Sequence, residues 1–358
     1  MGRSATRMVL AMACIGVAAL AAACGSSNDA ATDAASIDPL TETVPVSTIP
    51  ADTPPEPGIF RLTGQPSLAF DLVRAGAALG IAGREGLSMR IRPAASDDSV
   101  LAALRSGEAD AAVVSSDEAL ALASRGADLR IVLLLTTVTS GEAVLARADV
   151  GDVTGLVGRG VAYAAGTDGE LLLRGVLAAN DVPVTQVQLV RSGGRSPSTL
   201  LLDGSVDAAV TDGVRVLDTQ AADPSLVSIA TAGDEPGLLS RVLVVREEAV
   251  RTRPGQLLAF VRAWQALYDV ERDDPEAVAA SIAALQAVPV EDVTAELEGS
   301  ALYDVPANAV DLLPGGQYFD QTLRQIDAAA SAAGWLAAPV DPRALIDGAF
   351  AQAVASAR

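Results

Sequence analysis

Two groups of hydroxyl and carboxylate side chains stand directly after two copies of one short motif. The motif reads Gly-Glu-Ala-Asp-Ala-Ala-Val over residues 107–113 and Gly-Ser-Val-Asp-Ala-Ala-Val over residues 204–210. Glycine suits the left-handed position that ends a helix, and the apolar run suits a strand buried on both faces. The polar side chains that follow are Ser115, Ser116, Asp117, Thr211 and Asp212. Because open α/β sheets bind ligands at the carboxyl ends of their strands, these side chains are candidate ligand contacts.

Each of these side chains also has a structural alternative. Serine, threonine and aspartate are common N-caps, so each of them could cap the helix that follows its strand without touching a ligand. The motif's own aspartates, Asp110 and Asp207, stand at the starts of the strands, away from the ligand edge. We expect these two to orient the preceding turn.

The composition excludes several classes of function. The chain has 358 residues and no histidine, and all 25 of its basic residues are arginines. The missing histidine removes the commonest general base, the serine–histidine nucleophile pair and imidazole metal ligands. The net charge of −20 argues against nucleic acid as a partner, because phosphate binding requires basic patches. We therefore expect a non-enzyme with no catalytic residue, no metal, no cofactor and no nucleic-acid partner.

The first 24 residues resemble the export signal of a bacterial lipoprotein. Two arginines precede an apolar stretch over 9–23, which is short for a membrane span and normal for a signal peptide. Small residues before Cys24 resemble a lipobox, although Ala21 stands where a large apolar residue is usual. This resemblance implies a signal peptide over 1–23 and a lipid on Cys24, hence anchoring to the outer face of the bacterial cytoplasmic membrane. Cleavage as an ordinary secreted protein is the alternative.

The remainder of the chain predicts a tether followed by an α/β fold. Residues 24–57 are rich in Ser, Thr, Asp, Ala and Pro without a period, as in a disordered tether. Strands and helices then alternate, and the pattern restarts near residue 141. We expect a discontinuous first lobe over 58–140 and 241–358, and a second lobe over 141–240. The expected strands cover 59–62, 87–91, 110–114, 129–138, 160–165, 187–190, 226–230 and 241–246.

The C-terminal part carries a resemblance to a known family. The run Arg-Pro-Gly-Gln-Leu-Leu-Ala-Phe-Val-Arg-Ala-Trp over 253–264 is followed by Asp-Pro-Glu-Ala over 274–277, where a cap residue precedes a proline at a helix start. The ending Ala-Ala-Gly-Trp-Leu-Ala-Ala-Pro-Val-Asp-Pro covers 332–342. These segments resemble ABC-transporter solute-binding proteins of the nitrate/sulfonate/taurine family, including the relatives that bind thiamine-precursor pyrimidines.

This resemblance implies a type II periplasmic binding protein fold, with two α/β lobes, two crossover strands and a helical C-terminal segment. The protein would hold a small molecule in the cleft between the lobes and deliver it to the permease and ATPase of an ABC importer. It would be a monomer that meets the membrane only through its lipid. A ligand sensor for a membrane receptor is the alternative. An enzyme on the same fold is another, which the export signal and the missing histidine disfavour.

By position, the resemblance also implies which residues line the cleft. They are Gly64, Gln65 and Pro66 after the first strand, Ser115, Ser116 and Asp117 after the third, Thr167, Asp168 and Gly169 at a helix start, and Thr211 and Asp212 after the second motif. Arg191 and Arg195 flank a Ser-Gly-Gly loop at another strand end, where they could bind an oxyanion.

The charges of these residues give opposite indications about the ligand. Asp117, Asp168 and Asp212 would oppose a bound anion and would suit an amine or a neutral hydrogen-bonding molecule. Arg191 would favour an oxyanion. We adopt as hypothesis a polar organic ligand that is neutral or cationic.

Overall fold

The computed structural model describes residues 49–357. The expected signal peptide, the lipidated Cys24 and the expected tether up to residue 48 lie outside these residues. The described residues belong to one compact unit. None of the helices in this part of the chain is long and apolar enough to cross a membrane.

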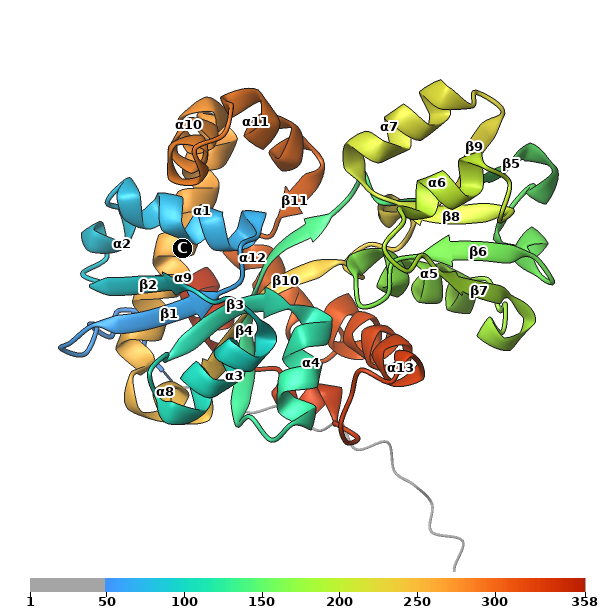
Figure 1. The fold of residues 1–358 in the computed structure, drawn as a ribbon. Coiled ribbons are helices and arrows are strands. Elements are labelled where there is room, and N and C mark those ends of the chain that lie inside the picture. Colours follow the sequence, from blue (N-terminus) through green and yellow to red (C-terminus); the bar gives the residue numbers. More distant parts are fainter. Residues whose placement is uncertain (1–48, 358) are drawn as a thin grey trace, which may run out of the picture. The chain divides into compact units, whose positions relative to one another are not determined.

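The first of two sheets, sheet A, has six strands in the order β11-β4-β10-β3-β1-β2 (Figure 1). Strands β1, β2 and β3 are parallel, as expected where helices connect the strands, whereas β10 lies antiparallel between β3 and β4. Both faces of β3 are buried, since Ala111 and Val113 belong to one hydrophobic cluster and Ala112 and Val114 to another. The strands are β1 Phe60–Gly64, β2 Met89–Pro93, β3 Ala111–Ser115, β4 Leu129–Val138, β10 Ser240–Arg246 and β11 Ser300–Leu302.

Helices pack on both faces of sheet A. One face carries α1, α9, α10 and α14, and the other carries α3 and α4. We call sheet A and these helices, with α2, α8, α11 and α12, lobe A. The helices are α1 Leu68–Ala78, α2 Ile81–Arg84, α3 Asp97–Ser106, α4 Ser116–Ser124, α8 Glu247–Thr252, α9 Pro254–Asp273, α10 Pro275–Gln286, α11 Val290–Glu298, α12 Val305–Asp311 and α14 Ala349–Ser356.

Sheet B has five strands in the order β7-β6-β8-β5-β9. Strands β6, β7 and β8 are parallel, and β5 is antiparallel to both β8 and β9. We call sheet B, with α5, α6 and α7, lobe B. Its elements are β5 Ala143–Arg147, β6 Gly160–Tyr163, β7 Gln188–Arg191, β8 Ala208–Thr211, β9 Leu226–Thr231, α5 Asp168–Ala179, α6 Pro197–Leu202 and α7 Gly213–Ala222.

Two links join the lobes. Residues 139–142 lead from β4 into β5, and residues 232–239 lead from β9 back to β10. The lobe boundaries expected at residues 140 and 240 stay a prediction.

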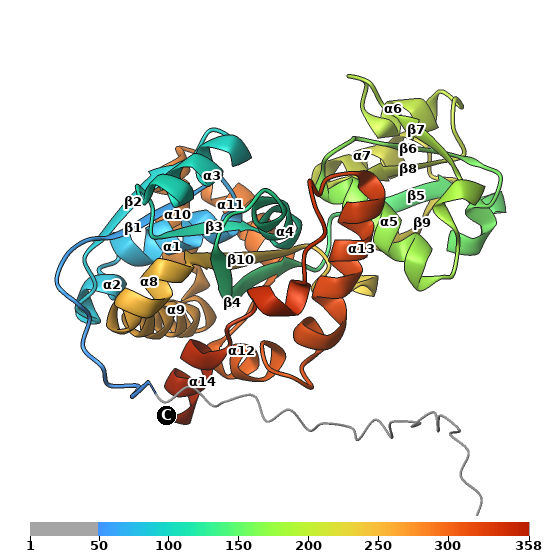
Figure 2. The same ribbon diagram turned by 90° about the horizontal axis from the view of Figure 1, so that it is seen from below.

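Helix α13 (Leu323–Ala333) packs on both lobes. It contacts α4 of lobe A and α5 of lobe B, and in Figure 2 it lies between them. Its residues Leu323, Ile326 and Ala329 belong to the same buried cluster as Ala112 and Val210, which are strand residues of the two motifs. One hydrophobic core therefore runs through both lobes.

The aspartates of the repeated motif hold the start of the neighbouring strand in each lobe. Asp110 Oδ2 accepts the backbone N–H of Arg61 at 2.9 Å, and Asp207 Oδ2 accepts that of Gly160 at 3.0 Å. Asp110 also pairs with the guanidinium groups of Arg61 and Arg253, at 2.6 and 3.1 Å. The role of both residues is structural, but their carboxylates hold the neighbouring strand and not the preceding turn as expected.

Two segments differ from a simple reading of the sequence. The stretch 341–350, whose sequence favours a single helix, contains a 3-10 turn at Pro342–Leu345, and helix α14 begins only afterwards. Between them Ile346 forms a bridge with Ile131, and the N–H of Asp347 donates to the carbonyl of Ile131, so the chain is extended there. Within the expected tether, the carboxylate of Glu56 accepts two backbone N–H groups at the start of α9.

We expect the two motif aspartates to differ in their contribution to stability. Asp110→Ala leaves two arginines and a backbone N–H without their shared partner, and the Asp110 side chain is only 2% exposed. This loss should lower the free energy of unfolding by about 2–4 kcal/mol. The Asp207 side chain is 40% exposed, so Asp207→Ala should cost less than about 1 kcal/mol. Urea unfolding followed by circular dichroism measures both, and equal losses would contradict this account.

Candidate functional site

A cleft of about 790 Å³ is lined by residues of both lobes, and its volume suits a small molecule. Lobe A contributes the turn after β1, the ends of β4 and β10, and α11. Lobe B contributes the starts of α5 and α7, and the link between β4 and β5 completes the lining. Its lining includes Pro66, Glu142, Asp168, Leu217, Arg241 and Glu296.

The crossover strands bring charged residues to the edges where the motif strands end. In sheet A, Arg241 of β10 lies opposite Ser115, and in sheet B, Ala143 of β5 lies opposite Thr211. An antiparallel strand begins where its neighbour ends. Arg241 and Glu142 are therefore placed beside the polar residues that follow the two motifs.

Arg241 and Asp168 form an ion pair between the lobes. Asp168 is the first residue of α5, where a negative charge also suits the positive end of the helix dipole. Arg241 Nη2 donates to Asp168 Oδ2 at 2.7 Å, and the two side chains are 22% and 28% exposed. Burial opposes the charge of Arg241, but the carboxylates of Asp168, Asp117 and Glu118 outweigh burial and raise the pKa of Arg241. Arg241 is therefore a permanent cation in the cleft.

Glu142 is an acid in the cleft whose charge is disfavoured. Its pKa is raised to about 8, first by burial and then by the negative charges of Asp168 and Asp212, against the opposing effect of Arg241 and Arg215. At neutral pH a large part of the Glu142 carboxyl groups carries a proton. A positive charge placed beside Glu142 would favour its ionised form.

Ser115 and Glu118 form a capping box at the start of α4. Ser115 Oγ accepts the N–H of Glu118 at 3.3 Å, and Glu118 Oε2 accepts the N–H of Ser115 at 2.8 Å. Gln65 Nε2 donates to Glu118 Oε1 at 3.0 Å and also to Asp97. Burial raises the pKa of Glu118 to about 7, with a contribution from the charges of Asp117 and Asp97. Gln65 and Ser115 thus hold a carboxyl group that is near its titration midpoint at neutral pH.

Among the contacts predicted in lobe A, Pro66 lines the cleft, whereas the others are not among its lining residues. Gly64 lies where a Cβ would come within 2.7 Å of the carbonyl of Val113, so strand packing requires a glycine there. Ser116 Oγ is buried and bonds to Ser240 Oγ and Tyr318 OH, each at 2.7 Å.

Asp117 is set next to the interlobe ion pair. Burial and the charge of Asp168 raise the pKa of Asp117, while Arg241 lowers it. Asp117 therefore belongs to the electrostatic surroundings of Arg241, although it does not itself line the cleft.

Among the contacts predicted in lobe B, Asp168 lines the cleft. Thr167 precedes it at the N-cap position, where its Oγ1 donates to the carbonyl of Ala164 at 2.8 Å. Gly169 faces Val210, whose Cγ1 would lie 3.1 Å from an added Cβ. These two residues fix the turn that carries Asp168.

The remaining predicted residues lie beside the cleft or away from it. Thr211 is buried at the end of β8, and Asp212 pairs with Arg215 at 2.7 Å just before Gly213, which does line the cleft. Arg191 Nε donates to the hydroxyl of Tyr163 at 3.2 Å. Arg195 pairs with Asp203. Neither of these arginines is among the residues that line the cleft.

Sequence reasoning missed Arg241 and Glu142. Ligand residues are expected after parallel strands, whereas Arg241 is the second residue of β10 and Glu142 directly precedes β5. Both of these strands are antiparallel to the motif strands. The signal available in the sequence was an arginine and a glutamate at the ends of the two links between the lobes.

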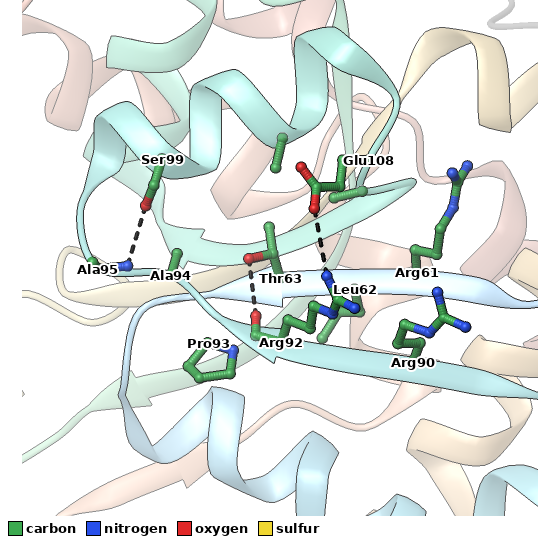
Figure 3. A pocket seen from close by; sticks show the side chains of 12 residues that line it. Arg61, Leu62, Thr63, Arg90, Arg92, Pro93, Ala94, Ala95, Ser99 and Glu108 are labelled. Atoms are coloured by element: carbon green, nitrogen blue, oxygen red, sulfur yellow. Dashed lines mark hydrogen bonds and ion pairs between the residues drawn. The ribbon is translucent and has the colours of Figure 1, made fainter.

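A second cavity, of about 350 Å³, lies on lobe A and shares no lining residue with the cleft (Figure 3). Arg61, Arg90 and Arg92 line it, but Arg61 is paired with Asp110, and Arg92 lies 3.5 Å from Glu108. No group of His, Cys, Asp and Glu side chains within residues 49–357 could hold a metal ion. The cleft between the lobes is therefore the candidate site.

Glu142→Gln should stabilise the protein at basic pH and leave it unchanged at acidic pH. The pKa of Glu142 in the folded state, about 8, exceeds its usual value of 4.5, so the folded state binds the proton more tightly. Stability is then lost as the pH rises from about 4.5 to 8. The variant avoids this loss and should gain about 1–2 kcal/mol at pH 8, less than full conversion of the shift gives because the cleft meets solvent. Urea unfolding at pH 4 and pH 8 measures the difference, and an equal gain at both values would refute it.

Comparison with known proteins identifies the fold. No curated protein matches the chain by sequence. The periplasmic aliphatic sulphonate binding protein SsuA from Escherichia coli superposes with a TM-score of 0.64 at 15% identity, covering 82% of this chain and 92% of its own. A putative sulfonate ABC transporter periplasmic sulfonate-binding protein, SsuA from Methylobacillus flagellatus KT, gives 0.64 at 16% identity, covering 84% and 94%.

A third structure names the fold itself. The Candida albicans CA3427 gene product, described as having the generic periplasmic binding protein structural fold, gives a TM-score of 0.53 at 13% identity, covering 84% of this chain and 95% of its own. The predicted α/β periplasmic binding protein fold with its helical C-terminal segment is confirmed. Residues 79–278 match the family model described as NMT1/THI5 like, which spans more than half of the sequence. The chain belongs to the NMT1/THI5-like family.

Proposed function

We propose that this protein is an extracytoplasmic solute-binding lipoprotein that captures a small polar organic molecule between its lobes and delivers it to an ABC importer. The observation that carries the proposal is the cleft of about 790 Å³, which both lobes line with charged and polar groups. Binding in such a cleft lets closure of the lobes report that the ligand is present. Such a state is what a permease and ATPase would recognise.

The family and the neighbouring structures support this proposal. Two of the neighbours are named as sulfonate-binding proteins, one of them of an ABC transporter. We propose binding without catalysis, because a chain without histidine lacks the commonest proton-transfer group.

The ligand we propose differs in charge from the sulfonates in the neighbours' names. Glu142, Asp168 and Glu296 line the cleft, and Arg241 is the one arginine among its described lining residues. Arg241 is already paired with Asp168. This excess of carboxyl groups opposes a simple anion and suits a molecule that is neutral or cationic overall.

The proposal includes the parts of the chain that lie outside the described residues. We propose a signal peptide over 1–23 and a tether that starts at Cys24 and ends before the contact of Glu56 with α9, with the lipid on Cys24 as the only membrane contact of a monomer. The proposed lobes cover 58–140 with 241–358, and 141–240. The lipobox resemblance supports the anchor, and the two sheets support the division into lobes.

Thermal shift and calorimetry on the purified protein should show binding of neutral or cationic polar molecules in preference to nitrate and small sulfonates. Leu217→Trp should weaken that binding at least tenfold, because Leu217 lines the cleft and is 70% exposed, so that the larger ring fills the cleft without disturbing the core. A preference for nitrate or small sulfonates that Arg191→Ala abolishes would overturn the proposed ligand class.

Cys24→Ser should release the protein from the membrane fraction of a bacterial host, because the lipid needs the thiol. The matched control is Cys14→Ser, which lies within the expected signal peptide and should leave the protein anchored. Fractionation and the intact mass measure the outcome. A Cys24→Ser protein that stays with the membrane would contradict the anchor.

A further inference from the structure

Two charged groups that line the cleft lack part of the bonding their chemistry requires. Arg241 Nη1 is buried and has no hydrogen-bond partner in the part of the chain that the structure describes. The carboxyl group of Glu142 likewise makes no hydrogen bond or ion pair with any described residue. Arg241 is a permanent cation, and Glu142 is a carboxyl group that ionises when a positive charge lies beside it, so together they define what a bound molecule must supply.

Arg241 requires an acceptor. Its Nη2 is occupied by Asp168 at 2.7 Å, which leaves the other arm of the guanidinium fork unsatisfied. A buried N–H group without an acceptor is unfavourable. The acceptors that best fit the geometry of a guanidinium are the oxygens of an oxyanion such as a carboxylate. The Nη1 position therefore suits an anionic end of a small ligand.

Glu142 requires a cation. The negative charges of Asp168 and Asp212 act on it, and the two nearby arginines are already engaged. Arg215 binds Asp212 through bonds of 2.7 and 2.9 Å, and Arg241 binds Asp168. An ammonium group at Glu142 would favour its ionised form and add to the partial compensation that Arg241 and Arg215 already give.

We propose that the cleft recognises a zwitterion, with its anionic end on Arg241 Nη1 and its ammonium end on Glu142. This inference rests on the proposed solute-binding function and specifies the ligand class. A simple anion leaves Glu142 unpaired and adds negative charge beside Asp168. A simple cation leaves Arg241 Nη1 without an acceptor. A molecule with both ends satisfies both groups and remains neutral overall.

The test is calorimetry with a panel of ω-amino carboxylates and ω-amino sulfonates of two to six carbons. Each is compared with its two halves, the acid without the amine and the amine without the acid. We expect one zwitterion to bind at least tenfold more tightly than either half. Tighter or equal binding by a half, or no binding by any zwitterion of the panel, overturns the proposal.

Three variants assign the two ends. Glu142→Gln should weaken the zwitterion at least tenfold and leave the acid half unchanged. Glu296→Gln, another acid of the same cleft, should change binding less than threefold. Arg241→Lys keeps a positive charge for Asp168 while it removes the second arm of the fork, so it should weaken the zwitterion and leave the amine half unchanged. Equal effects of Glu142→Gln and Glu296→Gln would overturn the assignment.

The fourth variant, Leu217→Trp, separates this inference from the proposed function. If a singly charged or uncharged compound binds best and Leu217→Trp abolishes its binding, the cleft is a solute site and only the zwitterion inference fails. If Leu217→Trp leaves the binding of every compound unchanged, the solute site is not in the cleft, and both proposals fail.

Discussion

One arginine carries the positive charge at the centre of a group of carboxyl groups contributed by both lobes. Arg241 is the second residue of β10 in lobe A, and its partner Asp168 is the first residue of α5 in lobe B. The pKa values of Asp117, Glu118 and Glu142 are all raised by burial and lowered in part by this guanidinium. The proposed ligand class, the protonation of the cleft and the electrostatic contact between the lobes therefore all depend on this side chain.

The same local pattern of helix, strand and antiparallel neighbour occurs once in each lobe. Each repeated motif ends a helix with glycine, anchors a neighbouring strand through its aspartate, and buries a short apolar strand. Each motif strand then receives an antiparallel neighbour that begins at its carboxyl end. The turns after parallel strands thus contribute Pro66 and Asp168 to the cleft. Arg241 lies in the antiparallel strand β10, and Glu142 directly precedes the antiparallel strand β5.

Sequence reasoning could predict the motif strands and the turns after the parallel strands. It could not predict which charged residues the antiparallel strands place beside them. The strand-to-helix turns with Pro66 and Asp168 follow from alternation and turn residues, and both line the cleft. Arg241 was assigned to a strand without a role, because its place beside Ser115 depends on pairing between distant segments. The capping bond of Ser115 and the buried network of Ser116 likewise depend on partners elsewhere in the fold, which helix-cap preferences do not name.

Helix α13 gives the molecule a connection that the chain path alone does not show. Its apolar face joins a buried cluster that contains strand residues of both sheets. If lobe B were transplanted onto another protein, the face of α5 that meets α13 would be left bare. The two halves are therefore poor candidates for recombination as separate building blocks, although each has a complete sheet of its own.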